Sequence, residues 1–443
     1  MLTEYLHRSL LLIFLVPSIT ANAQDSPVKR LTVPELFELA EKNSLQLDVS
    51  RKNISISGQQ AEIARSAKLP EISAEAEAGF LSNAAVFGPR FNYEETVPVP
   101  HLSNTFSVGA SETVFKGRAI RNGIEKAELE EQLSVLNFEK DKEDVQLLLL
   151  AKYLDLYTLY NQKEVYRQNI ELANQRLQNI RHMNQEGMVT RNDIIRSELQ
   201  ISDLTLKAKE VDNDITIINH ELCVTLGLPE ATRIQVDSSL YTTALAERPL
   251  ADYMRLADHQ NPAVLSSLVN EKIAGKNIQI AKAEKKPVIS LYAGNAFQRP
   301  FLYSMPPTDI YMNLFQAGVK LQYSISSLYH AKEHIHLAEL QQTKVVKQTE
   351  LIRQQTGLQV HAGFVKYNEA KDRLNTLEES LRLAVDNYRI VEKKYMNQLA
   401  LLTDILDAST ARLGAELNLS NARINIIYRW YQLKKATGNL QQQ

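Results

Sequence analysis

The sequence has little cysteine, glycine or proline and no excess of either charge. Its 443 residues include one cysteine, Cys223, so no disulfide can form within the chain and a buried, inert thiol is expected. Glycine (15 residues) and proline (14 residues) are both scarce, which favours long uninterrupted helices over tight turns. A formal net charge of −2 gives no basic surface, so we expect no nucleic-acid partner.

The sequence also lacks the marks of an enzyme. It has no glycine-rich phosphate loop, no nucleophile elbow and no Ser/His/Asp set, so we predict no catalytic residue and no cofactor. His330, His334 and His336 form one metal-like group, with the first two on one face of a helix. No cysteine accompanies them and they follow a predicted strand. We therefore predict solvated or interfacial histidines and no metal site.

The N-terminal residues 1–23 have the pattern of an export signal. His7 and Arg8 precede the apolar run Leu10–Val16, and Ala-Asn-Ala at 21–23 matches a small-x-small cleavage site. A soluble N-terminal helix is the alternative. Nowhere else is an apolar run long enough for a transmembrane helix, so contact with a membrane after export would require β-strands.

The most informative feature is an internal duplication. Residues 68–73 (KLPEIS) recur 217 positions later at 285–290 (KKPVIS), and further on the offset becomes 211, as when Asp193-Ile194-Ile195 returns at 404–406. The sequence therefore predicts a first repeat at 24–227, a connector at 228–250 and a second repeat at 251–443.

Each repeat has one predicted plan of a short helix, two strands, a long helix and another short helix. After Pro70 apolar and polar residues alternate, as in a strand. The proline-free stretches 116–186 and 326–396 would each form a helix of ~105 Å, and Ile201 to Leu222 follow a heptad. The predicted strands cover about 71–80, 105–115, 288–297 and 312–324, their loops about 81–104 and 297–310, and the shorter helices about 33–69, 190–226 and 251–286.

Four strands per chain are too few to enclose a pore. Their alternation places apolar side chains on one face and polar ones on the other, as a lipid-facing outside and a watery inside require. Open sheet edges cannot lie in lipid, so the chain must share strands with copies of itself, and three copies would give a twelve-stranded barrel. Two small soluble hairpins packed on a helical bundle are the alternative. The residues predicted to line the barrel lumen are Glu75, Glu77, Gln316, Lys320 and Gln322.

The ordered duplication resembles the TolC-like outer-membrane efflux family over essentially the whole mature chain. The marks that carry the resemblance are the helix ending in Leu69-Pro70, the Gly187-x5-Asp193 element with its second-half echo, and the closing glycines Gly227 and Gly438. The resemblance implies a homotrimer in the outer membrane of a Gram-negative bacterium, with a long antiparallel α-helical coiled-coil barrel continuous with the β-barrel. It further implies a periplasmic adaptor protein and an inner-membrane pump as partners.

The resemblance also implies that the breaks between long and short helices are periplasmic tips, where the tunnel narrows and is gated. Asp404 and Asp407 are three residues apart and would form two stacked carboxylate rings in a trimer, or would merely complement the helix dipole. Asp193 is a further gate candidate, although Thr190 before it also predicts a capping box.

Three more positions at the tips follow from the resemblance. Tyr395 matches a position whose hydroxyl helps to hold the mouth closed. Gln398 stands where a glycine would repeat Gly187 in the tip turn, and Ala400 stands where some members have an arginine that pairs with a tip aspartate. The salt-bridge lock of those members is therefore not expected. A passive exit duct is the predicted function; a secreted coiled-coil spacer without a pore is the alternative, and a hydrolase using the tip carboxylates is disfavoured.

Overall fold

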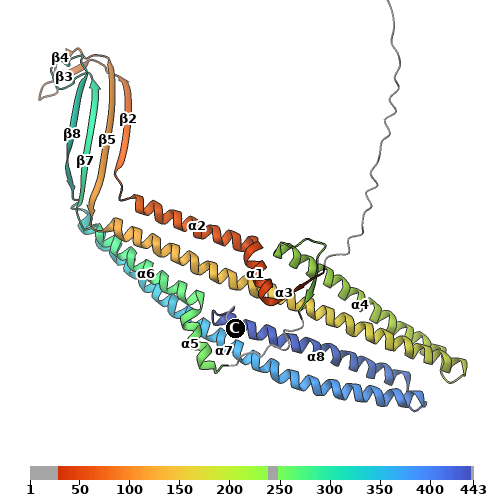
Figure 1. Ribbon diagram of the computed structural model, residues 1–443. Helices are drawn as coiled ribbons and strands as arrows, with labels where there is room; N and C mark the ends of the chain where they lie inside the picture. The colour runs from red at the N-terminus through yellow and green to blue at the C-terminus, as the bar shows by residue number, and fades with distance from the viewer. Residues whose placement is uncertain (1–27, 238–247, 441–443) are drawn as a thin grey trace, which may run out of the picture.

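The computed structural model of the protein describes residues 28–237 and 248–440. Figure 1 shows a sheet at one end and a long helical bundle that ends in two helical tips at the other. This confirms the predicted fold class, mainly α with a small β part. The predicted export signal at 1–23 and the middle of the predicted connector at 228–250 lie outside the described residues.

Both halves of the chain have the same order of main elements. Two short helices precede a pair of long strands, then comes a helix of 67 or 70 residues, and a helix of 36 or 35 residues follows it. The first half consists of β1 (Val28–Leu31), α1 (Val33–Asn43), α2 (Leu45–Ser66), β2 (Glu71–Phe80), β3 (Ala84–Phe87), β4 (Tyr93–Val97), β5 (Leu102–Lys116), α3 (Ala119–Gln185), α4 (Arg191–Leu226) and β6 (Arg233–Val236). The second half consists of α5 (Leu250–Gln260), α6 (Pro262–Ala283), β7 (Val288–Arg299), β8 (Met312–Gln322), α7 (Ser327–Met396) and α8 (Leu402–Ala436).

Two helices predicted to be continuous are broken in the structure. The helix predicted at about 33–69 is divided into α1 and α2 by Ser44, whose backbone is extended (φ −69°, ψ 119°). The helix predicted at 251–286 is divided into α5 and α6 by Asn261. Pro262 disfavours the helical conformation at Asn261, whose backbone is extended (φ −63°, ψ 120°), and the Asn261 side chain caps α6.

The ends of the shorter helices meet at these breaks. Asn43 Nδ2 donates to the carbonyl of Leu226, the last residue of α4, over 2.6 Å. Asn261 Nδ2 donates to the carbonyl of Ala436, the last residue of α8, over 3.0 Å. The C-terminal end of α4 therefore abuts the break before α2, and that of α8 abuts the N-terminus of α6. The negative end of one helix dipole faces the positive end of the next.

A glycine follows each of these helix ends. Gly227 and Gly438 have φ values of 65° and 72°, the left-handed conformation that ends many helices. A Cβ on Gly438 would lie 2.5 Å from Asn261 Cα, and one on Gly227 would lie 3.1 Å from the Asn43 side chain. Glycine is thus required at position 438 by close approach as well as by conformation.

The helices form four parallel columns. Next to the sheet, α2 packs on α3, α3 on α6 and α6 on α7. Towards the tips, α4 packs on α3, α3 on α8 and α8 on α7. Hence α2 and α4 occupy one edge of the protomer and α7 occupies the other, while α3 and α7 run unbroken through both levels (Figure 1). No helix among the described residues is both long enough and apolar enough to cross a membrane.

The sheet is antiparallel with strand order β2-β5-β7-β8, so β2 and β8 are its two edges. Its strands begin and end within a few residues of the predicted positions. The loop predicted at about 81–104 differs, because it contains the small antiparallel hairpin β3–β4 and because β5 begins at Leu102. Strands of four and five residues carry too little alternation to be recognised from sequence.

The largest core lies midway along the helices. β1 pairs with β6 in a two-stranded parallel sheet that packs with α1 against the middle of α3. Tyr153, fully buried on α3, donates its hydroxyl to the Leu31 carbonyl and accepts from the Asp237 N–H over 3.0 Å. Cys223 is buried here, as predicted, and its thiol contacts the Thr232 carbonyl over 3.2 Å. This core fixes the level at which the short helices are interrupted.

Candidate functional site

The first tip connects α3 to α4 through residues 186–190. Gly187 makes the turn with φ 72°, and nothing lies within 4 Å of a Cβ added there. Thr190 and Asp193 form a capping box: Asp193 Oδ2 accepts from the Thr190 N–H over 2.8 Å, and Thr190 Oγ1 accepts from the Asp193 N–H over 3.3 Å. The Asp193 carboxylate is therefore engaged by its own backbone, which is the structural role that its spacing predicts.

The second tip connects α7 to α8 and carries the other two carboxylates. Gln398 takes the place of the turn glycine and adopts φ 61°, which costs a non-glycine residue about 1 kcal/mol. Asp404 Oδ2 accepts from the Leu401 N–H over 2.8 Å, but Leu401 has no hydroxyl to complete a box. Asp404 and Asp407 are both exposed and lie one helical turn apart, so α8 presents two carboxylates at its first turns.

Tyr395 lies between the two tips rather than at the surface. It is 4% exposed in a cluster formed by α3, α7 and α8 with Ile180, Tyr388 and Ile405, against which Ala400 also packs. Its hydroxyl has no hydrogen-bond partner among the described residues.

The electrostatics of that hydroxyl connect it to the first tip. Burial raises the pKa of the Tyr395 hydroxyl, and the charge of Asp193 raises it further, while Arg176 opposes the rise. The structure thus brings Tyr395 close enough to Asp193 for their charges to interact. Asp404 and Asp407 are exposed to solvent at the same end of the molecule.

Sequence reasoning missed a buried arginine beside this cluster. Arg176 on α3 is 4% exposed, and its Nη2 reaches Ser409 Oγ on α8 at 3.3 Å, whereas its Nη1 has no partner among the described residues. Burial lowers the pKa of its guanidinium, and Tyr388, Glu392 and Tyr395 offset part of that effect. The available signal was its position on the apolar stripe of α3, between Ala173 and Ile180.

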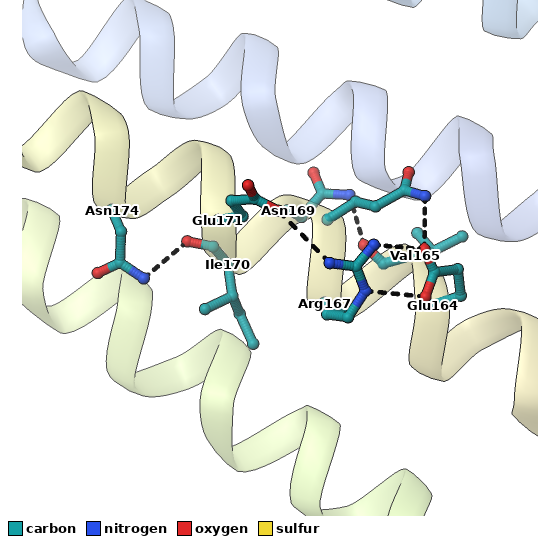
Figure 2. Close-up of polar contacts among 8 residues, drawn as sticks. Glu164, Val165, Arg167, Asn169, Ile170, Glu171 and Asn174 are labelled. Atoms are coloured by element: carbon teal, nitrogen blue, oxygen red, sulfur yellow. Dashed lines mark hydrogen bonds and ion pairs between the residues drawn. The ribbon is translucent and has the colours of Figure 1, made fainter.

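Above the tip, α3 runs between α4 and α8 with a polar outer surface. Figure 2 shows Arg167 bound to Glu164 through Nε and Nη2, at 2.9 and 2.7 Å, and to Glu171 at 3.4 Å. The side chains of Asn169 and Asn174 donate to carbonyls one turn earlier. The bonds of Arg167 and Asn174 lie within one helix and stabilise α3, whereas Asn169 Nδ2 also donates to Glu416 Oε2 over 2.9 Å and joins α3 to α8.

The five residues predicted to line the lumen lie at the other end of the molecule. Strand pairing places Glu75 opposite Ser107 and Glu77 opposite Thr105, and places Ser290 opposite Lys320. Following the register across all four strands, Glu75, Glu77, Gln316, Lys320 and Gln322 point to one face of the sheet. The opposite face carries mainly apolar residues, among them Ile72, Phe106, Leu291, Phe315, Val319 and Leu321.

The histidines predicted to be solvated are exposed at the start of α7. His334 Nδ1 lies 2.8 Å from Glu284, and no group of three or more metal-binding side chains occurs among residues 28–237 and 248–440.

Comparisons with known proteins agree with this geometry. A family model described as outer membrane efflux protein matches residues 36–227 and 254–439, in two blocks as the duplication requires. The outer membrane efflux protein BepC of Brucella suis is 23% identical over 414 residues, covering 90% of this chain and 84% of BepC. The outer membrane protein TolC of Vibrio cholerae is 19% identical over 412 residues, covering 92% and 91%.

Solved structures show the same fold. The outer membrane protein VceC of Vibrio cholerae superposes with a TM-score of 0.77 at 15% identity, covering 92% of this chain and 97% of VceC. The CmeC outer membrane channel of Campylobacter jejuni gives a TM-score of 0.73 at 15% identity, with 93% and 87% covered.

Proposed function

The chain belongs to the outer membrane efflux protein family, and from this premise we propose that it is the exit duct of a tripartite efflux or type I secretion system, a passive homotrimeric channel gated at its helical tips. As in its relatives, its place is the outer membrane of a Gram-negative bacterium, with the helices extending into the periplasm. A periplasmic adaptor and an inner-membrane pump are the proposed partners at the tips. Transport through such a duct requires no cofactor and no catalytic residue.

The unpaired edges of the sheet support a closed ring of identical copies. Among the strands that the structure describes, β2 and β8 each have a neighbour on one side alone, and the apolar face of the sheet is suited to lipid. β2 runs away from the helices and β8 runs back towards them, so β8 of one copy and β2 of the next are antiparallel, as closure demands. Three copies give twelve strands, with the polar face turned towards the lumen.

The edge columns of the helical bundle support the same assembly, and this observation carries the proposal. Large apolar side chains are exposed along α2 and α4 on one edge and along α7 on the other. Most are seven residues apart, with one step of 11 in α4 and one of 18 in α7, and each step is close to a whole number of helical turns. Such seams are buried when a coiled-coil partner packs on them. Each edge would thus be covered by the other edge of a neighbouring copy. The residues are Val49, Ile56 and Ile63 on α2, Leu199, Leu206, Ile217 and Val224 on α4, and Leu351, Leu358, Val365, Leu383 and Ile390 on α7.

The state of the purified protein in detergent tests this proposal. We expect a trimer in the outer-membrane fraction that migrates differently on gels before and after heating. A stable, heat-insensitive monomer in the soluble periplasmic fraction would refute the duct and would favour a secreted coiled-coil spacer without a pore.

We further propose that Asp404 and Asp407 form two acidic rings at the periplasmic mouth. Both side chains are exposed at the start of α8, and neither has an ion pair among the residues described. Rings of carboxylates concentrate cations and can be plugged by a multivalent one. Gly187, Gln398, Asp193 and Tyr395 would then set the tip turns and their packing rather than the charge of the mouth.

Conductance in planar bilayers tests the acidic rings. Replacing both aspartates by asparagine should reduce cation selectivity and abolish block by multivalent cations. The matched control is Asp203→Asn, an exposed aspartate on α4 that pairs with Lys207 over 2.9 Å, away from the tip. Unchanged selectivity and block in the double variant would remove the ring proposal and leave the duct intact.

A further inference from the structure

The two edge strands of the sheet carry opposite charges on the same face. β2 presents Glu75 and Glu77, and β8 presents Lys320, all exposed on the polar face. Within the described part of the chain none of the three has an ion pair. The other charged residues on this face are Glu71, at the base of β2, and Lys116, at the base of β5. The edges are thus complementary in charge where a second copy would meet them.

The internal repeat fixes how those edges would pair. In the first half Glu71 pairs with Ser111, and in the second half Val288 pairs with Gln322. These pairs are related by the sequence offsets of 217 for the first strand and 211 for the second. β2 therefore corresponds to β7, and β5 corresponds to β8. It follows that the seam between β8 and β2 of another copy corresponds to the seam between β5 and β7 within the chain.

The register of the seam within the chain can be transferred to the seam between copies. Inside the chain Gly109 of β5 pairs with Gly294 of β7. Applying the offsets, Gly109 becomes Lys320 and Gly294 becomes Glu77. Lys320 thus lies opposite Glu77 of the partner subunit, and Glu75 of the partner subunit lies one diagonal position away, still within reach of a lysine side chain.

The geometry points to an ion pair between Lys320 of each copy and Glu77 of the partner subunit, supported by the partner's Glu75, repeated at every seam of the ring. It rests on the proposed homotrimer. The same register matches the apolar faces by size, because Leu321 is then opposite the partner's Ala76 and Val319 is opposite the partner's Ala78. In both pairs a large side chain meets a small one, so neither pair is overpacked.

The contrast with the seam inside the chain suggests what the charges do. Two glycines meet there, so strand pairing within one copy needs no charge because the chain itself holds the strands together. Charges occur at the seam that must form between separate chains. These charges favour pairing of β8 with β2 of another copy. They disfavour pairing of β2 with another β2, where glutamates would face one another. The pair therefore selects the correct closing edge and sets its register.

Disulfide trapping tests the register. Lys320→Cys and Glu77→Cys are combined in a Cys223→Ser background, so that the engineered cysteines are the sole thiols. Residues directly opposite on neighbouring strands are close enough for a disulfide. We expect oxidation to give covalent dimers and trimers on denaturing, non-reducing gels. The control combines Lys320→Cys with Ala78→Cys, whose side chain points to the other face, and should not cross-link.

The outcomes separate this inference from the trimer itself. A heat-sensitive trimer that forms without any Lys320–Glu77 cross-link would overturn the register and leave the duct proposal standing. Absence of a trimer would overturn the duct proposal.

A charge exchange provides the second test. Lys320→Glu should reduce the fraction of heat-sensitive trimer, and adding Glu75→Lys with Glu77→Lys should restore it. Lys116→Glu, on the same face but on the inner strand β5, is the control and should have little effect. A Lys320→Glu variant as trimeric as the unmodified protein would refute the ion pair.

Discussion

Glu143 on α3 has a carboxyl group that the fold partly removes from water, which disfavours its charged form. It lines a cavity of about 650 Å³ at the junction of α3, α6, α7 and α8, near Lys435 and Asp144. Burial raises the pKa of the Glu143 carboxyl to about 7, although the Leu440 N–H and Lys435 both favour the charged form. We predict that Glu143→Gln stabilises the protein at pH 8 and removes a pH dependence near neutrality.

The size and sign of the effect on the free energy of unfolding follow from the raised pKa of Glu143. Well below pH 4.5 the Glu143 carboxyl is protonated in both the folded and the unfolded chain, so this group costs no stability there. Between pH 4.5 and about 7 the folded chain keeps a proton that the unfolded chain has lost, so stability falls as pH rises, and above that range the loss is complete. The rise in pKa corresponds to about 3 kcal/mol, most of it lost between pH 5 and 8.

Denaturant unfolding of the detergent-solubilised protein measures this loss. The one tryptophan, Trp430, packs against α5 and α7 near the cavity and reports unfolding of this region by fluorescence. Glu143→Gln should give a larger free energy of unfolding at pH 8 and nearly the same value at pH 5. Glu171→Gln, an exposed glutamate further along α3, is the control. If the difference between Glu143→Gln and the unmodified protein is the same at both pH values, the assignment is wrong.

Three further variants test the packing by the same measurement. Gly438→Ala should destabilise the protein by more than 2 kcal/mol because its Cβ would meet Asn261 at 2.5 Å, whereas Gly187→Ala, in open space, should cost about 1 kcal/mol from backbone strain alone; equal effects would contradict the close approach. Gln146→Leu should stabilise by about 1 kcal/mol, since both amide atoms are buried without partners in the described region; a loss of stability would show that the amide is satisfied. Tyr153→Phe should cost about 2 kcal/mol by leaving two buried backbone groups unpaired, and a neutral effect would refute that role.

The fold could be predicted from the sequence wherever a regular period ran for long enough. The long helices and the four main strands are examples, because proline-free stretches and two-residue alternation are direct signals of each. The break at Ser44 gave no such signal, since serine is compatible with a helix. Pro262 did mark the second break, but the apolar pattern on both sides of it favoured one continuous helix.

The candidate site was predictable only in part. The capping box of Asp193 follows from four consecutive residues, so a local pattern was enough. The burial of Tyr395 depends on packing among α3, α7 and α8, which no local pattern encodes. Arg176 was missed for the same reason, because a single cation on an apolar stripe is ordinarily assumed to extend to solvent. The gate itself stays a prediction, as does the ring closure on which it depends.

The interrupted columns have a mechanical consequence. α4 and α8 each end at a break bridged by an asparagine amide, whereas α3 and α7 continue past that level without a gap. A torque applied at the tips is therefore transmitted to the membrane end through the continuous helices α3 and α7. The α2–α4 and α6–α8 columns transmit less of it, because each is interrupted at its break.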